Sequence, residues 1–331
     1  MSGQGVREAV LLKLSDGRFH SGQDLALALG ITRTAVWKHV KGLEKGLGLT
    51  ISAIRGRGYR LTAPLELFDD NRIRAELSGA SKASLDALSV VQVVDSTNSC
   101  ASADLPLQSQ RAKVWLAEMQ TAGRGRRGRK WVSSFGENLY LSLAWRFDLA
   151  MNDLAGLSLV AGVVVAESLQ RLGLEGHTLK WPNDILFDGR KLCGILIEAS
   201  GEAGGPATAV IGIGVNFRIP ADQGELIDQP WMDLQQAGAP SVSRNRMAGM
   251  LIDGLINACQ TYATQRLSPF LNRWNRFDQM RDREVLLLRG DQVNTGIYRG
   301  ITTSGALLLD EISGRREYHA GEVSLRVRGP V

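Results

Sequence analysis

The chain has 331 residues, of which 44% are hydrophobic and 22% are charged, and its formal net charge is +5. At about 150 residues per domain this length predicts two or three globular domains, and the composition excludes a disordered chain and a disulfide-stapled miniprotein. The uncharged apolar stretch 154–166 has 13 residues, fewer than the roughly 20 of a membrane-spanning helix, so we expect no membrane association.

The amino terminus and the cysteines indicate a reducing compartment. Arg7 and Glu8 interrupt the apolar run that a secretory signal requires. The three cysteines, at positions 100, 193 and 259, show neither a CxxC pair nor a Cys/His spacing, so we predict no disulfide framework and no metal site. We therefore expect a cytoplasmic protein with reduced, buried thiols.

Positive charge is concentrated near the amino terminus. Residues 1–64 hold ten Lys and Arg against four Asp and Glu, whereas the remainder of the chain carries a net charge of −1. A small basic module is typical of a nucleic-acid-binding domain, because neutralisation of phosphates supplies much of the affinity. A solvated basic face is the alternative, and charge alone does not separate the two.

The predicted elements of this module are three helices and a hairpin. Apolar spacing predicts helices over 6–15, 22–29 and 32–44, with Ser21 and Thr32 as N-caps. Strands over 51–54 and 59–61 flank a turn with two arginines. This order resembles a winged helix-turn-helix domain. Its predicted DNA-binding face consists of Arg33, Thr34, Trp37, Lys38 and Lys41 on the third helix and of Arg55 and Arg57 on the wing.

A protein-interaction module is the alternative to this DNA-binding domain. In that interpretation the lysines are incidental and Trp37 packs against the hairpin. The local charge and the arginines of the hairpin turn favour DNA. Residues 62–72 change in character to proline and acidic residues, so we predict a linker there.

Two predicted strands that follow end in polar residues. The strand 89–94 leads into Ser96, Thr97 and Asn98, small polar side chains at a strand end, where ligand pockets form. A helix cap is the alternative explanation of this cluster. The strand 114–119 leads into residues 120–131, in which four arginines and a lysine lie within seven positions.

We interpret residues 120–131, QTAGRGRRGRKW, as an anion-binding loop, which we call the arginine loop. Its glycines match GxGxxG, but the third glycine leads to a turn and another strand rather than to a helix, so a dinucleotide-binding fold is not expected. Glycines allow close backbone approach, and guanidinium groups pair with carboxylates and phosphates. We expect the loop to be mobile when empty and ordered over a phosphate-bearing ligand. A nucleic-acid-binding RGG segment is the alternative, against which its position between two strands argues.

Lys180 is a candidate buried cation. It lies between apolar and aromatic neighbours at a strand end, before a turn that contains Asn183 and Asp184. A structural ion pair is the alternative, unless the arginine loop faces this lysine. A core strand over 193–198 and a glycine-interrupted strand over 211–217 follow, and such interruptions mark a bulge or close backbone approach.

Two further segments bear on the fold. The helix predicted over 157–172 is apolar nearly all round and should be buried. Short strands between 284 and 327 alternate with glycine-containing turns, which predicts a small β-barrel similar to an SH3 domain.

Six motifs resemble those of the biotin protein ligases in order and approximate spacing. They are STN (96–98), QTAGRGRRGRKW (120–131), ENLYLSL (137–143), KWPND (180–184), RKLCGILIE (190–198) and GIGVN (212–216). With its amino-terminal module the chain resembles the bifunctional type, which also represses the biotin operon; residues 218–245 match least. The resemblance implies an α/β multidomain fold with a winged helix-turn-helix (1–64), a mixed α+β catalytic domain similar to class II synthetases (65–280) and an SH3-like β-barrel (281–331).

The resemblance also implies a two-step reaction. Biotin and MgATP form biotinyl-5′-adenylate, which then biotinylates a lysine of the biotin carboxyl carrier protein of acetyl-CoA carboxylase. Biotin and its adenylate would be bound by Ser96, Thr97, Asn98, Gln120, Arg124, Gly125, Arg126 and Lys180. The nucleotide would be bound by Arg127, Arg129, Trp131, Asn183, Lys191 and Asn216, with Lys180 and Arg126 as catalytic residues. Asp184 is a candidate for handling the proton of the acceptor lysine, and Cys193 departs from the small residue expected at its position.

Regulation and two alternatives follow from the same resemblance. Adenylate binding would favour a homodimer, which places two winged helices on a two-fold operator DNA, so that the adenylate is also the corepressor. A biotin-sensing regulator without catalysis is one alternative, against which the intact arginine loop and Lys180 argue. A lipoate-attachment enzyme is the other, and the sequence of the arginine loop favours biotin.

Overall fold

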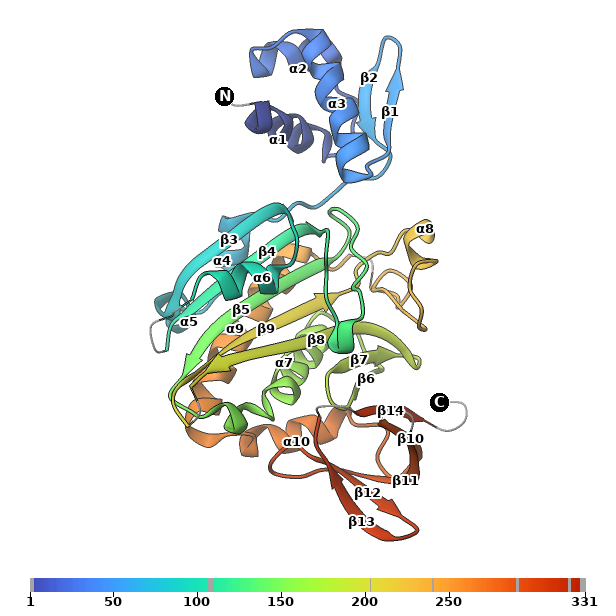
Figure 1. The fold of residues 1–331 in the computed structure, drawn as a ribbon. Coiled ribbons are helices and arrows are strands. Elements are labelled where there is room, and N and C mark those ends of the chain that lie inside the picture. Colours follow the sequence, from blue (N-terminus) through green and yellow to red (C-terminus); the bar gives the residue numbers. More distant parts are fainter. Residues whose placement is uncertain are drawn as a thin grey trace.

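The computed structural model describes residues 3–105, 107, 110–202, 204–239, 241–289, 292–320 and 323–327. The chain forms an amino-terminal helical unit, a central seven-stranded sheet with its helices, and a carboxyl-terminal sheet (Figure 1). The first and last units lie at opposite ends of the central sheet, so this sheet is the frame that carries both.

The amino-terminal unit has the predicted order of three helices and a hairpin. Helices α1 (Gly3–Leu14), α2 (Gly22–Leu29) and α3 (Arg33–Leu47) precede the antiparallel strands β1 (Ile51–Ile54) and β2 (Gly58–Leu61). The hydroxyl groups of Ser21 and Thr32 cap α2 and α3, as predicted. Helix α3 runs about one turn further than predicted and ends at Gly48, whose φ of 67° stops the helix.

The predicted linker is held in place at both of its ends. On the amino-terminal side, the main-chain N–H of Leu65 donates to the carbonyl of Ser15 at 2.9 Å. The side chain of Leu65 is buried in the core of the helical unit, together with Phe135 from the central domain. Composition therefore locates the junction between the two units correctly. The junction is not a free linker, because Leu65 packs against both units.

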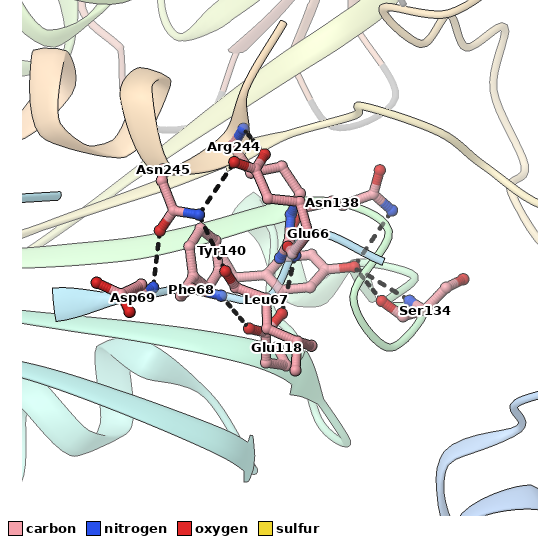
Figure 2. A network of polar contacts seen from close by, with 10 residues as sticks. All are labelled: Glu66, Leu67, Phe68, Asp69, Glu118, Ser134, Asn138, Tyr140, Arg244 and Asn245. Atoms are coloured by element: carbon pink, nitrogen blue, oxygen red, sulfur yellow. Dashed lines mark hydrogen bonds and ion pairs between the residues drawn. The ribbon is translucent and has the colours of Figure 1, made fainter. Parts of the chain in front are cut away.

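A buried polar network holds residues 66–69, the segment that follows Leu65, as Figure 2 shows. The N–H of Phe68 donates to the carboxylate of Glu118 at 2.6 Å. The guanidinium of Arg244 lies 2.9 Å from the same carboxylate, and both side chains are at most 5% exposed. Burial of an ion pair is costly unless further hydrogen bonds satisfy the charges. Arg244 makes them, since it also donates to the carbonyls of Glu66 and Asn138.

The central sheet has the strand order β3-β4-β5-β9-β8-β7-β6. Its strands are β3 (Leu85–Val94), β4 (Ala112–Gln120), β5 (Leu139–Phe147), β6 (His177–Lys180), β7 (Asp184–Phe187), β8 (Arg190–Gly201) and β9 (Ala207–Val215). Strands β3 and β4 pair in parallel and the other pairs are antiparallel. The ends of β3 and β4 therefore lie side by side, which brings the two polar segments that follow them together.

Helices cover both faces of this sheet. Helices α7 (Leu157–Arg171) and α9 (Arg244–Gln265) pack on one face and α6 (Thr97–Ala103) on the other. Neighbouring strand residues alternate between the faces: Val114 belongs to the main core and Trp115 to the cluster under α6. The remaining helices are α4 (Asp70–Ala75), α5 (Gly79–Ser84), η1 (Arg126–Gly128), η2 (Met151–Leu154), α8 (Ala221–Gly224) and α10 (Ser268–Phe277).

Helix α7 is the buried central helix that the sequence predicts. Within the described residues, Met151–Arg171 is long and apolar enough to cross a membrane, but 72% of its most apolar window is buried inside the protein. The apolar residues of this stretch are accounted for by the core between α7, α9 and the sheet.

The carboxyl-terminal unit is a five-stranded antiparallel sheet with the order β13-β12-β11-β10-β14. Its strands are β10 (Glu284–Arg289), β11 (Gln292–Ile301), β12 (Leu307–Glu311), β13 (Gly314–Tyr318) and β14 (Val323–Val327). The succession of short strands agrees with the prediction, but the closed barrel is not found, since the edge strands β13 and β14 do not pair within the described residues. Strand β13 is almost fully exposed, so it has no apolar face with which to close the sheet.

Candidate functional site

The structure places Gln120 at the end of β4, so the arginine loop comprises residues 121–131. Two adjoining hollows lie where this loop meets the sheet. The first, of about 460 Å³, is bordered by Ser96, Thr97, Asn98, Gln120, Arg124, Gly125, Arg126 and Trp131 and by glycines of β8 and β9. The second, of about 590 Å³, is bordered by Arg126, Arg127, Arg129, Trp131, Lys180, Asn183, Asp184 and Lys191. Arg126, Trp131, Asn183 and Lys191 border both, so the two hollows form one continuous site.

The floor of the first hollow is a connected set of buried polar side chains, and Thr97 and Asn98 are each 4% exposed. The side-chain oxygen of Gln120 accepts from the N–H of Thr97 at 2.8 Å and from its hydroxyl at 3.1 Å. The hydroxyl oxygen of Ser142 lies 2.7 Å from that of Thr97, and it donates to Asn98 Oδ1 at 2.6 Å. The amide nitrogen of Asn98 donates to Glu198 at 2.7 Å.

This floor favours the pocket over the helix-cap explanation of the STN motif. Ser96 occupies the N-cap position of α6, but its side chain makes no capping hydrogen bond. Asn98 instead points to the sheet, where a Cβ at position 212 would lie 2.2 Å from Asn98 Oδ1. The glycine of the interrupted strand β9 therefore makes room for this asparagine.

The arginine loop folds back on itself as a narrow hairpin. The N–H of Gly125 donates to the carbonyl of Arg129 at 2.7 Å, and the N–H of Trp131 donates to the carbonyl of Gly123 at 2.9 Å. Arg127, at the tip, has a φ of 60°, a left-handed conformation that is rare outside glycine. The chain then continues to β5 without a helix, which agrees with the rejection of a dinucleotide-binding fold.

Trp131 packs against two paired strands. Gly194 of β8 and Gly214 of β9 are direct partners in the sheet. A Cβ at position 194 would lie 2.7 Å from the indole, and a Cβ at position 214 would lie 2.6 Å from it. The ammonium of Lys191 lies 5.4 Å from the ring centroid, within the range of a cation–π contact. Two glycines of the predicted motifs thus form the seat of a large aromatic side chain.

Among the described residues that border the second hollow, cations surround one carboxylate, Asp184. The ammonium of Lys191 lies 2.9 Å from Asp184, and both side chains are largely buried. Burial lowers the pKa of Lys180 below its ordinary value, an effect that Asp184 opposes and Lys191 adds to. Burial also lowers the pKa of the Arg126 guanidinium, again against Asp184. Lys180 and the arginine loop border the same hollow, which favours the ligand-binding interpretation of this lysine over a purely structural ion pair.

Asn216 is the predicted site residue that borders neither of these hollows. Its amide donates to the carbonyl of Lys191 at 3.2 Å and to the carbonyl of Met232 at 3.0 Å, and the residue is 6% exposed. The amide therefore holds the main chain on which Lys191 stands. Cys193 is buried beside this region, and burial raises the pKa of its thiol, so it is an inert core residue.

The predicted DNA-binding residues lie on the exposed side of the amino-terminal unit. Arg33, Thr34, Trp37, Lys38 and Lys41 of α3 and Arg55 and Arg57 of the hairpin are all exposed. Arg33, Thr34, Trp37 and Arg55 border a groove between α3 and the hairpin. Trp37 is 50% exposed, so it is not packed into the core, while Arg57 stacks on Phe19 at 4.1 Å.

The comparisons with known proteins cover all three units. An HTH domain matches residues 7–60, the Biotin/lipoate A/B protein ligase family matches 90–216, and the Biotin protein ligase C terminal domain matches 282–326. The bifunctional ligase/repressor BirA of Salmonella typhimurium is 42% identical over 313 residues, which are 95% of each chain. This chain belongs to the bifunctional ligase/repressor BirA family.

Two further relatives agree with membership of the BirA family. The biotin–[acetyl-CoA-carboxylase] ligase of Paracoccus denitrificans is 34% identical over 233 residues, which are 69% of this chain and 96% of the relative. The solved structure of the biotin protein ligase from Aquifex aeolicus, in complex with biotin and ATP, matches with a TM-score of 0.62 at 27% identity. The match covers 73% of this chain and 100% of that one.

Several residues that border or support the site in this BirA-family chain received no role from the sequence. Ser142 and Glu198 lie in the quoted motifs ENLYLSL and RKLCGILIE, but their partner Asn98 is 44 and 100 positions away. Strand alternation is the signal that could have found Glu198, because it places residues 194, 196 and 198 on one face. The carbonyl of Ala320, which accepts from Arg126, follows from no local pattern.

Proposed function

We propose that this BirA-family protein joins biotin to ATP as biotinyl-5′-adenylate and then transfers biotin to a lysine of the biotin carboxyl carrier protein of acetyl-CoA carboxylase. The observation that carries the proposal is the continuity of the two hollows. One has a buried floor of neutral hydrogen-bonding groups and the other is ringed by cations, and Arg126 and Lys191 stand where they meet.

The first hollow suits the biotin end of the adenylate. Ser96, Thr97, Asn98 and Gln120 offer donors and acceptors to the ureido ring, and Trp131 offers an apolar wall. Arg124, Gly125 and Arg126 border the same hollow from the loop side. In this proposal the floor selects biotin and the loop encloses it.

The second hollow suits the reacting groups. A carboxylate oxygen of biotin attacks the α-phosphorus of MgATP, and the bond to the departing pyrophosphate breaks. Negative charge is concentrated where these groups meet, and fixed cations stabilise it without reorganisation. Lys180 and Arg126 are placed for that role, while Arg127 and Arg129 border the same hollow for the triphosphate.

The remaining nucleotide residues act around this centre. Trp131 covers the base, Asn183 and Lys191 contact the nucleotide, and Asn216 acts through the main chain of Lys191. The Mg²⁺ arrives with ATP as part of the substrate. Mg²⁺ keeps most of its ligands as water and phosphate, so few protein ligands are expected for it.

In the second step the acceptor lysine attacks the carbonyl carbon of the adenylate and AMP leaves. An unperturbed lysine has a pKa near 10.4, so freeing its amine at pH 7 costs roughly 4 to 5 kcal/mol. A neighbouring carboxylate can take up that proton, and Asp184 borders the hollow in which the anhydride would lie. We assign the proton to Asp184.

The same protein would be cytoplasmic and would repress biotin synthesis. It would do so as a homodimer bound to operator DNA. In the described part of the chain, β7 pairs with β8 only as far as Gly194, although β8 continues to Gly201. The N–H and carbonyl of Ile195 still bond to Asn183. Beyond Ile195, the outer edge of β8 has no partner strand among the described residues and offers its main-chain groups to a second copy. Adenylate binding next to this edge would favour the dimer, which brings two winged helices to a two-fold operator.

We keep the predicted domain limits within this proposal. Residues 1–64 form the winged helix-turn-helix domain and residues 65–280 a catalytic domain similar to class II synthetases. Residues 281–331 form an SH3-like domain. The open sheet of the last unit agrees with that domain in strand number and antiparallel order.

Incubation with radiolabelled biotin, MgATP and a carrier domain tests the enzyme proposal. We expect label on the carrier that depends on ATP and on the acceptor lysine. A biotin-sensing regulator without catalysis would bind label and transfer none, and a lipoate-attachment enzyme would transfer lipoate in preference to biotin. Either result would contradict the proposal.

Operator binding tests the regulatory part. Affinity for operator DNA should rise when biotin and MgATP are supplied together, because the adenylate favours the dimer. Equal affinities with and without the two substrates would remove the coupling, while leaving the ligase activity standing.

A further inference from the structure

Glu198 is a carboxylate that contacts two residues at the border of the first hollow, Asn98 and Arg124. In strand β8 the residues Gly194, Leu196 and Glu198 share one face, and the first two border the hollow. One oxygen of Glu198 accepts from the buried amide of Asn98 at 2.7 Å. The same oxygen accepts from the guanidinium of Arg124 at 3.0 Å. Glu198 therefore joins the floor of the hollow to the arginine loop.

This contact closes a path of hydrogen bonds around the first hollow. The path starts at Gln120, the last residue of β4, and passes through the floor to Asn98. From there it runs through Glu198 to Arg124, four residues after Gln120 and inside the loop. The beginning of the loop is thus fixed at two points, once by the strand from which it leaves and once by Glu198.

The ion pair between Arg124 and Glu198 contributes little to the free energy of folding. The side chains of Arg124 and Glu198 are 46% and 35% exposed, and exposed ion pairs contribute little to folding. Its effect is on position, because it fixes a guanidinium at the rim of a hollow and orients the asparagine in the floor. A guanidinium held in place loses less freedom when a ligand arrives.

We propose that Glu198 is a positioning residue for biotin, which holds Arg124 over the first hollow and fixes the amide orientation of Asn98 before the substrate binds. The proposal rests on the proposed function, since it assigns the first hollow to biotin. It predicts an effect on biotin binding rather than on ATP binding or on the chemical step, because the two partners of Glu198, Asn98 and Arg124, border the first hollow and not the second.

The variant Glu198→Gln tests this assignment, since it keeps the shape and an acceptor for Asn98 but removes the charge that holds Arg124. We expect the KM for biotin in adenylate formation to rise about 10-fold, from the loss of one charge-assisted hydrogen bond. The KM for ATP and kcat should stay within about two-fold. Trypsin should cut the ligand-free loop faster, because Arg127, Arg129 and Lys130 are exposed on it.

Three further variants make the test specific. Glu202→Gln removes the same charge from an exposed position just beyond β8 and should leave both readouts unchanged. Glu198→Asp keeps the charge and should recover most of the biotin affinity. In an Arg124→Gln background, Glu198→Gln should add less than about two-fold, because the partner is already absent.

The outcomes that would contradict the proposed function differ from those that would contradict the role of Glu198. If the wild-type protein forms no biotinyl adenylate, the proposed function fails. If the wild type is active, the Glu198 assignment is overturned by an unchanged KM for biotin in Glu198→Gln. It is also overturned by an equal effect of Glu202→Gln, or by a loss confined to kcat.

Discussion

The floor of the first hollow and the arginine loop that covers it are held in different ways. The floor side chains Thr97, Asn98 and Ser142 are almost fully buried and hydrogen bond to one another. The loop is a hairpin closed by its own main chain, and Arg127, Arg129 and Lys130 are exposed on it. The floor is built into the sheet, whereas the loop is attached to the site through a few side chains.

This difference assigns different tasks to the two regions. Buried, mutually bonded polar groups discriminate between ligands, because a ligand that fails to replace their hydrogen bonds leaves them unpaired. Exposed guanidinium groups attract anions and gain most when a ligand excludes water from them. We therefore expect floor variants to change which ligand binds and how tightly, and loop variants to change retention of the charged intermediate.

The largest effect should come from the cation on the rigid side of the site. Lys180→Ala should lower the single-turnover rate of adenylate formation about 10²- to 10³-fold, since it removes a fixed charge from the transition state. Biotin binding should weaken less than this rate falls, because the floor residues of the first hollow remain in place. Lys82→Ala, an exposed lysine of α5, serves as the control. A rate within three-fold of wild type would exclude Lys180 as a catalytic residue.

Next in size should be the release of the adenylate from a loop variant. Arg126 donates to Asn183 at 3.1 Å and to the carbonyl of Ala320, so it ties the loop to the turn between β6 and β7 and to the carboxyl-terminal unit. Arg126→Gly should release biotinyl adenylate about 10- to 100-fold faster, from the loss of one or two charge-assisted bonds. Chase of labelled adenylate with unlabelled ligand measures the rate. Retention equal to wild type would contradict a closing loop.

A floor variant should have a smaller effect, confined to biotin. Ser142→Ala leaves Asn98 and Thr97 without a shared partner, which should weaken biotin binding about 10-fold and cost about 1 to 3 kcal/mol of stability. Ser168→Ala is the matched control, because Ser168 is 3% exposed and its hydroxyl bonds to the carbonyl of Val164 within α7. Calorimetry with biotin should separate the two variants. Equal biotin affinities would contradict the role of the floor.

The smallest predicted effect is a dependence on alkaline pH. Burial lowers the pKa of Lys180 from its ordinary value of 10.5, and only the protonated form stabilises negative charge. Adenylate formation should therefore decline several-fold as the pH rises through this lowered pKa. Lys180→Arg, whose side chain stays charged, should shift the decline to higher pH. An unchanged pH profile would show that another group controls the decline.

Deprotonation of Lys180 should affect folding stability and activity in opposite directions. Between the lowered pKa of folded Lys180 and the value of 10.5, the unfolded chain binds more protons than the folded one. Folding stability contributed by this group therefore rises with pH in that window, while activity falls. Thermal unfolding across the window, compared between wild type and Lys180→Arg, separates the two trends.

Local patterns predicted most of what this site contains. Caps, glycines and apolar spacing gave the helices of the amino-terminal unit to within about a turn. The motifs that follow β3 and β4 were recognised because each is chemically dense over a few residues. That these two motifs would border one pocket was predictable in outline, since ligand pockets often form at strand ends.

Long-range pairing explains what sequence analysis did not assign. The contact between Asn98 and Glu198 depends on which strands are neighbours, and no local spacing encodes it. Asn216 lies in a recognised motif, yet its amide is used by the main chain of Lys191 and Met232. The barrel prediction rested on short apolar strands that alternate with glycine-containing turns, whereas closure needs an apolar face that the exposed strand β13 lacks.

Hydrogen exchange of residues 121–131 tests the central claim most directly. Wild-type protein alone, with biotin, and with biotin plus MgATP should show stepwise slower exchange in this segment, with the largest protection once the adenylate forms. The floor helix α6 should be protected in all three conditions. Exchange in 121–131 that is unchanged by both substrates would contradict a loop that closes over the intermediate.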